Sequence, residues 1–123
     1  MGLDLNKLSP DLQNKIMNFN NLRKTIDFLT QQKFEIERSM KDAEIAIEEL
    51  EKTESDTVVY KSIGGIFVKS DRDRLLEEKK SQKASLELKL KTLGQREERT
   101  KKQLETLSTS IEKDLKDQGI GLS

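Results

Sequence analysis

The sequence predicts a mainly α-helical protein, a long antiparallel coiled-coil helical hairpin with one small β-hairpin at the bend. Two long stretches rich in Glu, Lys, Gln and Leu carry apolar residues at alternating intervals of three and four, the spacing of a coiled coil. Between them lies TVVYKSIGGIFVKS (57–70), where β-branched and aromatic residues surround a Gly-Gly pair. Charged residues make up 37% of the 123 residues and apolar residues 33%, a composition that suits narrow helical seams better than a globular core.

We expect the first helical arm over residues 10–54, preceded by a flexible N-terminal tip of residues 1–9. Ser9 can cap the helix, Pro10 suits the first helical position, and Asp11 favours the positive end of the helix dipole. Lysine provides the one polar position of the predicted seam. The seam residues are Phe19, Leu22, Ile26, Leu29, Lys33, Ile36, Met40, Ala43, Ile47 and Leu50.

The second arm is expected over residues 71–117, followed by a flexible C-terminal tip of residues 118–123. In the segment SDRD, Ser70 is expected to cap the helix while Asp73 reaches back to it, as in a capping box. The seam of this arm contains more polar positions than that of the first. Its residues are Leu76, Lys79, Lys83, Leu86, Leu90, Leu93, Glu97, Thr100, Leu104, Leu107 and Ile111.

One register pairs the two seams along their whole length. When the second arm folds back on the first, Leu50 faces Leu76, and the same register carried along the arms brings Lys33 opposite Leu93. Because polar seam positions meet apolar partners without a slip in register, the two arms are predicted to form one intramolecular coiled coil.

Residues 57–70 are predicted to form a β-hairpin that serves as an assembly joint. Gly64 and Gly65 suit a two-residue turn between strands 58–63 and 66–69, because glycine tolerates the positive φ that such turns need. Both faces of this hairpin are partly apolar and both edges are open, so an isolated copy is marginal in water and we expect other subunits to cover it. The expected assembly residues are Val58, Val59, Tyr60, Ile63, Gly64, Gly65, Ile66, Phe67 and Val68.

Little in the sequence points to catalysis. It contains no His and no Cys, so it lacks the common nucleophile–base pairs, zinc ligands and disulfides. GGIFVKS lacks the Walker spacing, and the acidic segment EIAIEELEKTESD (44–56) is typical of a solvated helix face, although it could bind a divalent cation. We therefore predict no enzyme, with no catalytic residue, no metal site and no cofactor.

Charge and hydropathy narrow the range of partners. The 23 basic and 23 acidic residues are intermixed, which argues against a nucleic-acid surface. No apolar run approaches the roughly 20 residues of a membrane span, and no signal peptide is visible. We expect a cytoplasmic protein with neither nucleic-acid nor membrane partners.

Apolar residues outside the seams gather near the two chain ends, at the tips of the arms away from the hairpin. Fraying of the helix ends accounts for such a pattern, and an exposed apolar surface for a partner without fixed shape is the functional interpretation. The candidate substrate-binding residues at the tips are Leu5, Leu8, Leu12, Ile16, Ile111, Leu115, Ile120 and Leu122. Four more apolar residues lie off the seams and have no assigned role, although a face turned toward neighbouring arms is possible: Phe28, Phe34, Ile45 and Leu88.

The order helix, short β-hairpin, helix resembles the prefoldin family, and most closely its archaeal β subunits. The most specific likeness is VYKSIGGIFVK (59–69), with its Tyr-Lys pair, turn glycine and apolar-Val-Lys ending, and QREER (95–99) is a further point of similarity. The single hairpin marks the β type, since α subunits of the family carry two. The resemblance covers nearly the whole chain.

The resemblance implies an ATP-independent molecular chaperone, or holdase. In the family, four β subunits join two prefoldin α subunits in a hexamer whose hairpins assemble into a double β-barrel. The coiled-coil tips capture unfolded polypeptides and deliver them to a group II chaperonin. A structural coiled-coil adaptor or tether with no activity on unfolded proteins is the alternative.

Overall fold

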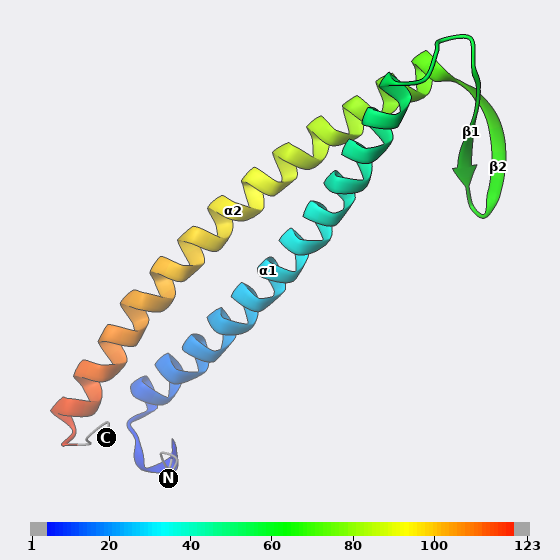
Figure 1. Ribbon diagram of the computed structural model, residues 1–123. Coiled ribbons are helices and arrows are strands. Elements are labelled where there is room, and N and C mark those ends of the chain that lie inside the picture. The colour runs from blue at the N-terminus through cyan, green and yellow to red at the C-terminus, as the bar shows by residue number, and fades with distance from the viewer. Residues whose placement is uncertain (1–4, 120–123) are drawn as a thin grey trace. The chain divides into compact units, whose positions relative to one another are not determined.

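The computed structural model describes residues 5–119 and contains two long helices joined by a two-stranded β-hairpin (Figure 1). This arrangement confirms the predicted fold class. The elements are the 3₁₀ helix η1 (Leu5–Lys7), helix α1 (Pro10–Glu51), strand β1 (Val58–Ile63), strand β2 (Ile66–Asp71) and helix α2 (Arg72–Asp117).

The chain divides into two compact parts, each built from segments of both helices. The terminal part contains the residues up to Gln31 and from Gly94 onward, whereas the central part, Gln32–Leu93, includes the β-hairpin. The segments of α1 and α2 are antiparallel within each part. In the terminal part Leu12 packs near Leu115 while Thr30 donates a 3.0 Å hydrogen bond to Glu97, and in the central part Leu50 packs with Leu76 while Glu44 pairs with Lys83.

The predicted seam lies between the helices in both parts. All of its positions are buried or half-buried, whereas the four off-seam apolar residues of the arms are exposed. Thr100 is a buried polar seam residue whose hydroxyl donates a 2.8 Å hydrogen bond to the Arg96 carbonyl of its own helix. Because each helix buries only one stripe against the other, a low content of apolar residues is sufficient for this fold.

We expect Leu29→Ala to lower the free energy of unfolding by about 2–5 kcal/mol, because Leu29 is fully buried in the seam. Leu88→Ala is the matched control, since it makes the same change at a side chain that is 66% exposed and should lower stability by less than about 0.5 kcal/mol. Chemical unfolding followed by far-UV circular dichroism measures both. Equal losses for the two variants would contradict the assignment of the seam.

The ends of α1 have separate local causes. Ser9 caps the N-terminus as predicted, with its Oγ accepting a 3.2 Å hydrogen bond from the Leu12 amide. The helix ends at Glu51 rather than at residue 54, because the Thr53 amide donates to the Leu50 carbonyl at 3.1 Å and tightens the last turn.

The predicted cap of α2 is wrong by one residue. Strand β2 continues through Asp71, which pairs with Val58, so Ser70 belongs to the strand and Asp71 takes the N-cap position before Arg72. The carboxylate of Asp73 accepts a 2.8 Å hydrogen bond from Arg72 instead of reaching back to Ser70. Ser70 and Asp71 are both of residue types that favour N-caps. Asp71 takes the cap position because Ser70 and Asp71 are both still paired in the sheet and the helix begins only after them.

The β-hairpin has the predicted turn, and both of its faces carry apolar residues as predicted. Gly64 and Gly65 have φ values of 53° and 84°, the positive pair that a two-residue type I′ turn requires. The antiparallel register pairs Ile63 with Ile66 next to this turn. Opposite residues share a face, so one face carries Val59, Lys61, Ile63, Ile66, Val68 and Ser70 and the other carries Val58, Tyr60, Ser62, Phe67, Lys69 and Asp71.

Candidate functional site

The β-hairpin exposes large apolar side chains on both of its faces. Its strands pair only with each other in the part of the chain that the structure describes, which leaves two open edges. Phe67 is the most exposed of these side chains, at 77%. The set comprises Val58, Tyr60, Ile63, Ile66, Phe67 and Val68. Such a surface predicts a contact with other polypeptide, because an uncovered apolar hairpin with open edges favours further strand pairing.

Val59 differs from the other predicted assembly residues because it packs inside its own chain. It lies half-buried against a cluster formed by Leu50, Leu75 and Leu76. This contact attaches the beginning of β1 to the adjoining ends of the two helices. The sequence did not indicate this contact, because Val59 is a β-branched strand residue like its exposed neighbours Val58 and Val68.

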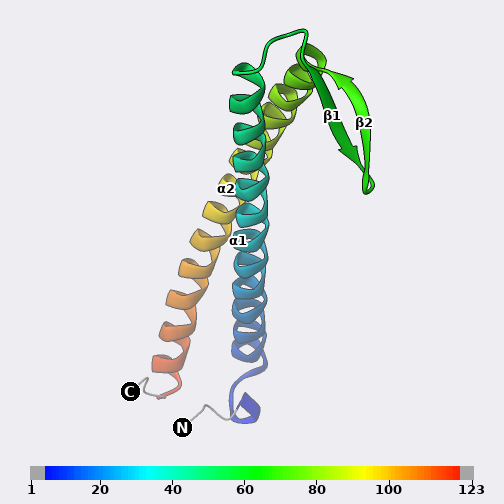
Figure 2. The ribbon, with the colours of Figure 1, turned by 45° about the vertical axis from the view of Figure 1, so that its right-hand side comes forward.

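An ion pair attaches the same face of the hairpin to α2. Lys61 Nζ lies 2.8 Å from the Glu78 carboxylate. The hairpin folds back from the start of α2 and diverges from this helix toward its own turn (Figures 1 and 2). The hydrogen bond from Lys61 lowers the pKa of the Glu78 carboxyl, and the charges of Lys61, Arg74 and Lys79 also lower it, although desolvation acts in the opposite direction. Glu78 is therefore ionised and paired at neutral pH.

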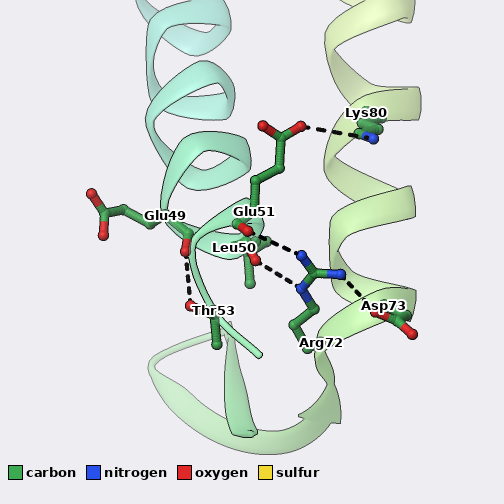
Figure 3. Close-up of polar contacts among 7 residues, drawn as sticks. All are labelled: Glu49, Leu50, Glu51, Thr53, Arg72, Asp73 and Lys80. Carbon is green, nitrogen blue, oxygen red and sulfur yellow. Dashed lines mark hydrogen bonds and ion pairs between the residues drawn. The ribbon is translucent and has the colours of Figure 1, made fainter. Parts of the chain in front are cut away.

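Arg72 joins the end of α1 to the start of α2 (Figure 3). Its Nε donates a 2.7 Å hydrogen bond to the Leu50 carbonyl, and a terminal nitrogen donates to the Glu51 carbonyl at 3.3 Å. The other terminal nitrogen bonds Asp73 at 2.8 Å, and the Glu51 carboxylate lies 3.8 Å from Lys80. Arg72 thus satisfies carbonyls at the C-terminus of α1 and places a positive charge at the negative end of that helix.

Arg72→Ala is expected to lower the free energy of unfolding by roughly 1–3 kcal/mol, because it leaves two helix-end carbonyls without this charged donor. Arg74→Ala is the control. Its side chain is largely exposed and reaches Glu78 only at 4.0 Å, so its loss should change stability little. Urea unfolding measures both variants, and an equally small effect of the two would show that the Arg72 contacts do not hold the joint.

Five apolar residues at the ends of α1 and α2 form a compact group, here called the tip cluster: Leu8, Leu12, Ile16, Ile111 and Leu115. Leu8, Leu12 and Leu115 are only 5%, 0% and 2% exposed, and the two isoleucines pack against them half-buried. The expectation that these leucines are exposed is therefore wrong. Leu8 packs across both helices and closes the cluster.

Three further predicted tip residues cannot be placed in this cluster. The backbone of Leu5 belongs to η1, so part of the predicted flexible tip is a helical turn. Ile120 and Leu122 lie outside the residues that the structure describes. Their role in binding remains a prediction from the sequence.

Charged residues flank the tip cluster. Lys15 Nζ donates hydrogen bonds to Asp114 Oδ2 at 2.5 Å and to Ser110 Oγ at 2.8 Å, which links α1 to α2. Within residues 5–119, no three acidic residues are placed together so that they could hold a metal ion. Neither helix, over the same residues, has a stretch long and apolar enough to cross a membrane.

The fold and these surfaces define a two-helix coiled-coil protein with a β-hairpin joint. Residues 13–118 match the protein family described as "Prefoldin subunit". The chain is 36% identical to prefoldin subunit beta of Methanothrix thermoacetophila, over 89% of this chain and 91% of that protein. It is 33% identical to prefoldin subunit beta of Pyrobaculum arsenaticum, over 89% and 88% of the two chains.

A solved structure agrees with these sequence comparisons. The crystal structure of the prefoldin beta subunit from Thermococcus strain KS-1 superposes with a TM-score of 0.79 at 27% identity, covering 89% of this chain and 96% of that one. The chain belongs to the prefoldin family of chaperone subunits, and its resemblance to the beta type is confirmed.

Proposed function

We propose that this chain is a subunit of an ATP-independent holdase that captures unfolded polypeptides. The observation that carries the proposal is the β-hairpin with apolar side chains exposed on both faces and both edges open. In the proposed hexamer, four copies join two prefoldin α subunits, and their hairpins form a double β-barrel. The residues that other subunits would cover are Val58, Tyr60, Ile63, Ile66, Phe67 and Val68 around the Gly64–Gly65 turn, with Val59 tying the hairpin to its own helices.

Client capture in this proposal uses the tip cluster. Apolar burial is non-directional, so one set of aliphatic side chains can hold clients of different sequence. Each contact is weak, but several tips in one particle act together and raise the overall avidity. Weak single contacts also allow release to a group II chaperonin without nucleotide hydrolysis.

The wider biochemical role follows from the same proposal. The protein would act in the cytoplasm without a cofactor, a metal or a catalytic residue, and its partners would be the α subunit, the client and the chaperonin. Nucleic acids and membranes would have no part in its function. The balanced charge and the absence of His and Cys support this reading.

Exposed aromatic side chains on α1 support a second candidate for client capture in each part of the chain. In the terminal part Phe28 is largely exposed. In the central part Phe34 is largely exposed, and the Arg38 guanidinium lies 5.5 Å from the centre of its ring. Exposed aromatic residues provide large apolar contact areas, so each of these residues, taken by itself, is an alternative to the tip cluster.

Mixing the chain with a prefoldin α subunit tests the proposal. We expect a six-subunit particle by size-exclusion chromatography with light scattering, and we expect it to suppress aggregation of a chemically denatured protein after dilution. A particle that forms without any effect on aggregation would favour the adaptor or tether. Failure to form a particle would contradict the proposed assembly.

A further inference from the structure

Leu8 lies outside both long helices and yet is almost fully buried. It contacts a cluster whose other members are fixed on regular helices, Leu12 and Ile16 on α1 and Ile111 and Leu115 on α2. A leucine from the segment before the helix therefore fills a site that the two helix ends create together.

Side-chain amides contact the segment that carries Leu8. Gln13 Nε2 donates a 2.9 Å hydrogen bond to the Leu8 carbonyl, and Gln118 Nε2 donates to Ser9 Oγ at 3.0 Å. Both bonds join neutral groups near the surface, where each contributes modestly because water can replace either partner. Since α1 begins only at Pro10, Leu8 can leave the cluster without unwinding the helix.

We propose that Leu12 and Leu115 form a binding site for one aliphatic side chain of an unfolded client, and that Leu8 occupies this site until a client displaces it. The inference rests on the proposed holdase function and adds a ligand class and a competitor to it. Leu8 acts as an internal substitute for the client. The site is closed in the free chain and binds a client only in the fraction of molecules in which Leu8 is displaced.

The occupant present in the structure indicates which client segments fit. Leu8 lies between the 3₁₀ helix η1, which ends at Lys7, and helix α1, which begins at Pro10, and its neighbours Lys7 and Ser9 are polar. An aliphatic residue in a short polar segment outside an α-helix is therefore accepted. Asn6 and Lys7 are exposed. Leu, Ile, Val or Met in such a segment of a client is the expected ligand.

The rim of the site carries more acidic than basic side chains. Lys15 and Asp114 form an ion pair there. Asp11 and Asp117 line the same groove beside Ser9. A basic residue beside the aliphatic one in the client segment is therefore expected to favour binding.

Leu8→Ser tests the competition in the complex assembled with the α subunit. We expect binding of a labelled, reduced and carboxymethylated α-lactalbumin to tighten between about threefold and tenfold, because the competent fraction rises when the competitor is removed. Leu88→Ser is the matched control, because it makes the same change at an exposed leucine of the central part and should not tighten binding. Fluorescence anisotropy measures the affinity, and bis-ANS fluorescence independently reports the opened apolar site.

A second variant closes the site. Ser9→Cys with Gln118→Cys, joined by a short bis-maleimide, ties the Leu8 segment to α2, and the natural chain has no other cysteine to react. We expect the crosslinked complex to bind the unfolded probe several-fold more weakly than the same variant before crosslinking.

The outcomes separate this inference from the function on which it rests. If the unaltered complex binds no unfolded α-lactalbumin, the holdase proposal fails, and the competition fails with it. If the unaltered complex binds the probe but Leu8→Ser leaves the affinity unchanged or weakens it, the holdase stands and the competition is overturned. Unchanged bis-ANS fluorescence of Leu8→Ser, or full binding by the crosslinked complex, also overturns it.

Discussion

Phe67→Asp is expected to abolish the hexamer while leaving the helices folded. Phe67 lies across from Ser62 on the outward face of the hairpin and is 77% exposed in the single chain, so its loss removes no contact of the helical seam. In the proposed assembly the new carboxylate would be buried between subunits without a cationic partner, which costs several kcal/mol for each copy. The assembly constant should therefore fall by many orders of magnitude.

Phe28→Asp is the matched control for this prediction. It introduces the same charge in place of a largely exposed phenylalanine on α1, outside the residues of the hairpin, and should leave the hexamer intact. Size-exclusion chromatography with light scattering measures the mass, and far-UV circular dichroism verifies the helix content. An unchanged mass for Phe67→Asp would rule out the hairpin as the assembly joint.

The double variant Ile16→Glu with Ile111→Glu is expected to weaken client capture at least about tenfold. Both side chains belong to the tip cluster, and each contributes about 1–2 kcal/mol to binding when partly buried by a client. The loss is repeated in every copy of this chain within the proposed particle, so the avidity of the particle falls more steeply than the affinity of one tip. Light scattering from a diluted, chemically denatured client measures the effect.

Asn18→Glu with Thr109→Glu adds the same charges at neighbouring exposed positions and should suppress aggregation as well as the unaltered chain. The mass of the hexamer should be the same for both double variants, since neither touches the hairpin. Should the Ile16 and Ile111 variant protect the client fully, the tip cluster is not the capture site. Phe28 and Phe34 would then be the better candidates.

The helical seam was predictable because its signal is repeated along the sequence. Residues such as Leu29, Ala43 and Leu50 recur at multiples of seven, and each repeat strengthens the same conclusion about which face is buried. The hairpin was predictable for a different reason. A Gly-Gly pair between β-branched residues is typical of a hairpin turn with two positive φ values, because glycine adopts them without steric strain.

The contacts that position the candidate site carry no such repeated signal. In the sequence, nothing distinguishes Arg72 from the many other charged residues. Its role depends on the fold, which places the carbonyls of Leu50 and Glu51 within hydrogen-bond distance of its guanidinium. Leu8 lies before the predicted start of the first helix, so its spacing of four residues from Leu12 does not by itself indicate burial. Both cases depend on where a chain end or a helix end lies in space, which local sequence does not determine.

The attachment of the hairpin to its own helices changes the thermodynamics of association. The two six-residue strands are held in one orientation relative to the helix ends before any partner binds. The contacts that hold them are made by Arg72, by Val59 and by the Lys61–Glu78 ion pair. Ordering a free backbone costs about 1–2 kcal/mol per residue, a penalty that a loose hairpin would meet only on binding. Because the hairpin is already fixed to its own helices, this entropy cost is included in the folding of the monomer and does not reduce the affinity of association. In the proposed assembly, the affinity between subunits is therefore expected to be sensitive to substitutions at Arg72 or Glu78, residues on α2 that need not touch the neighbouring subunit at all.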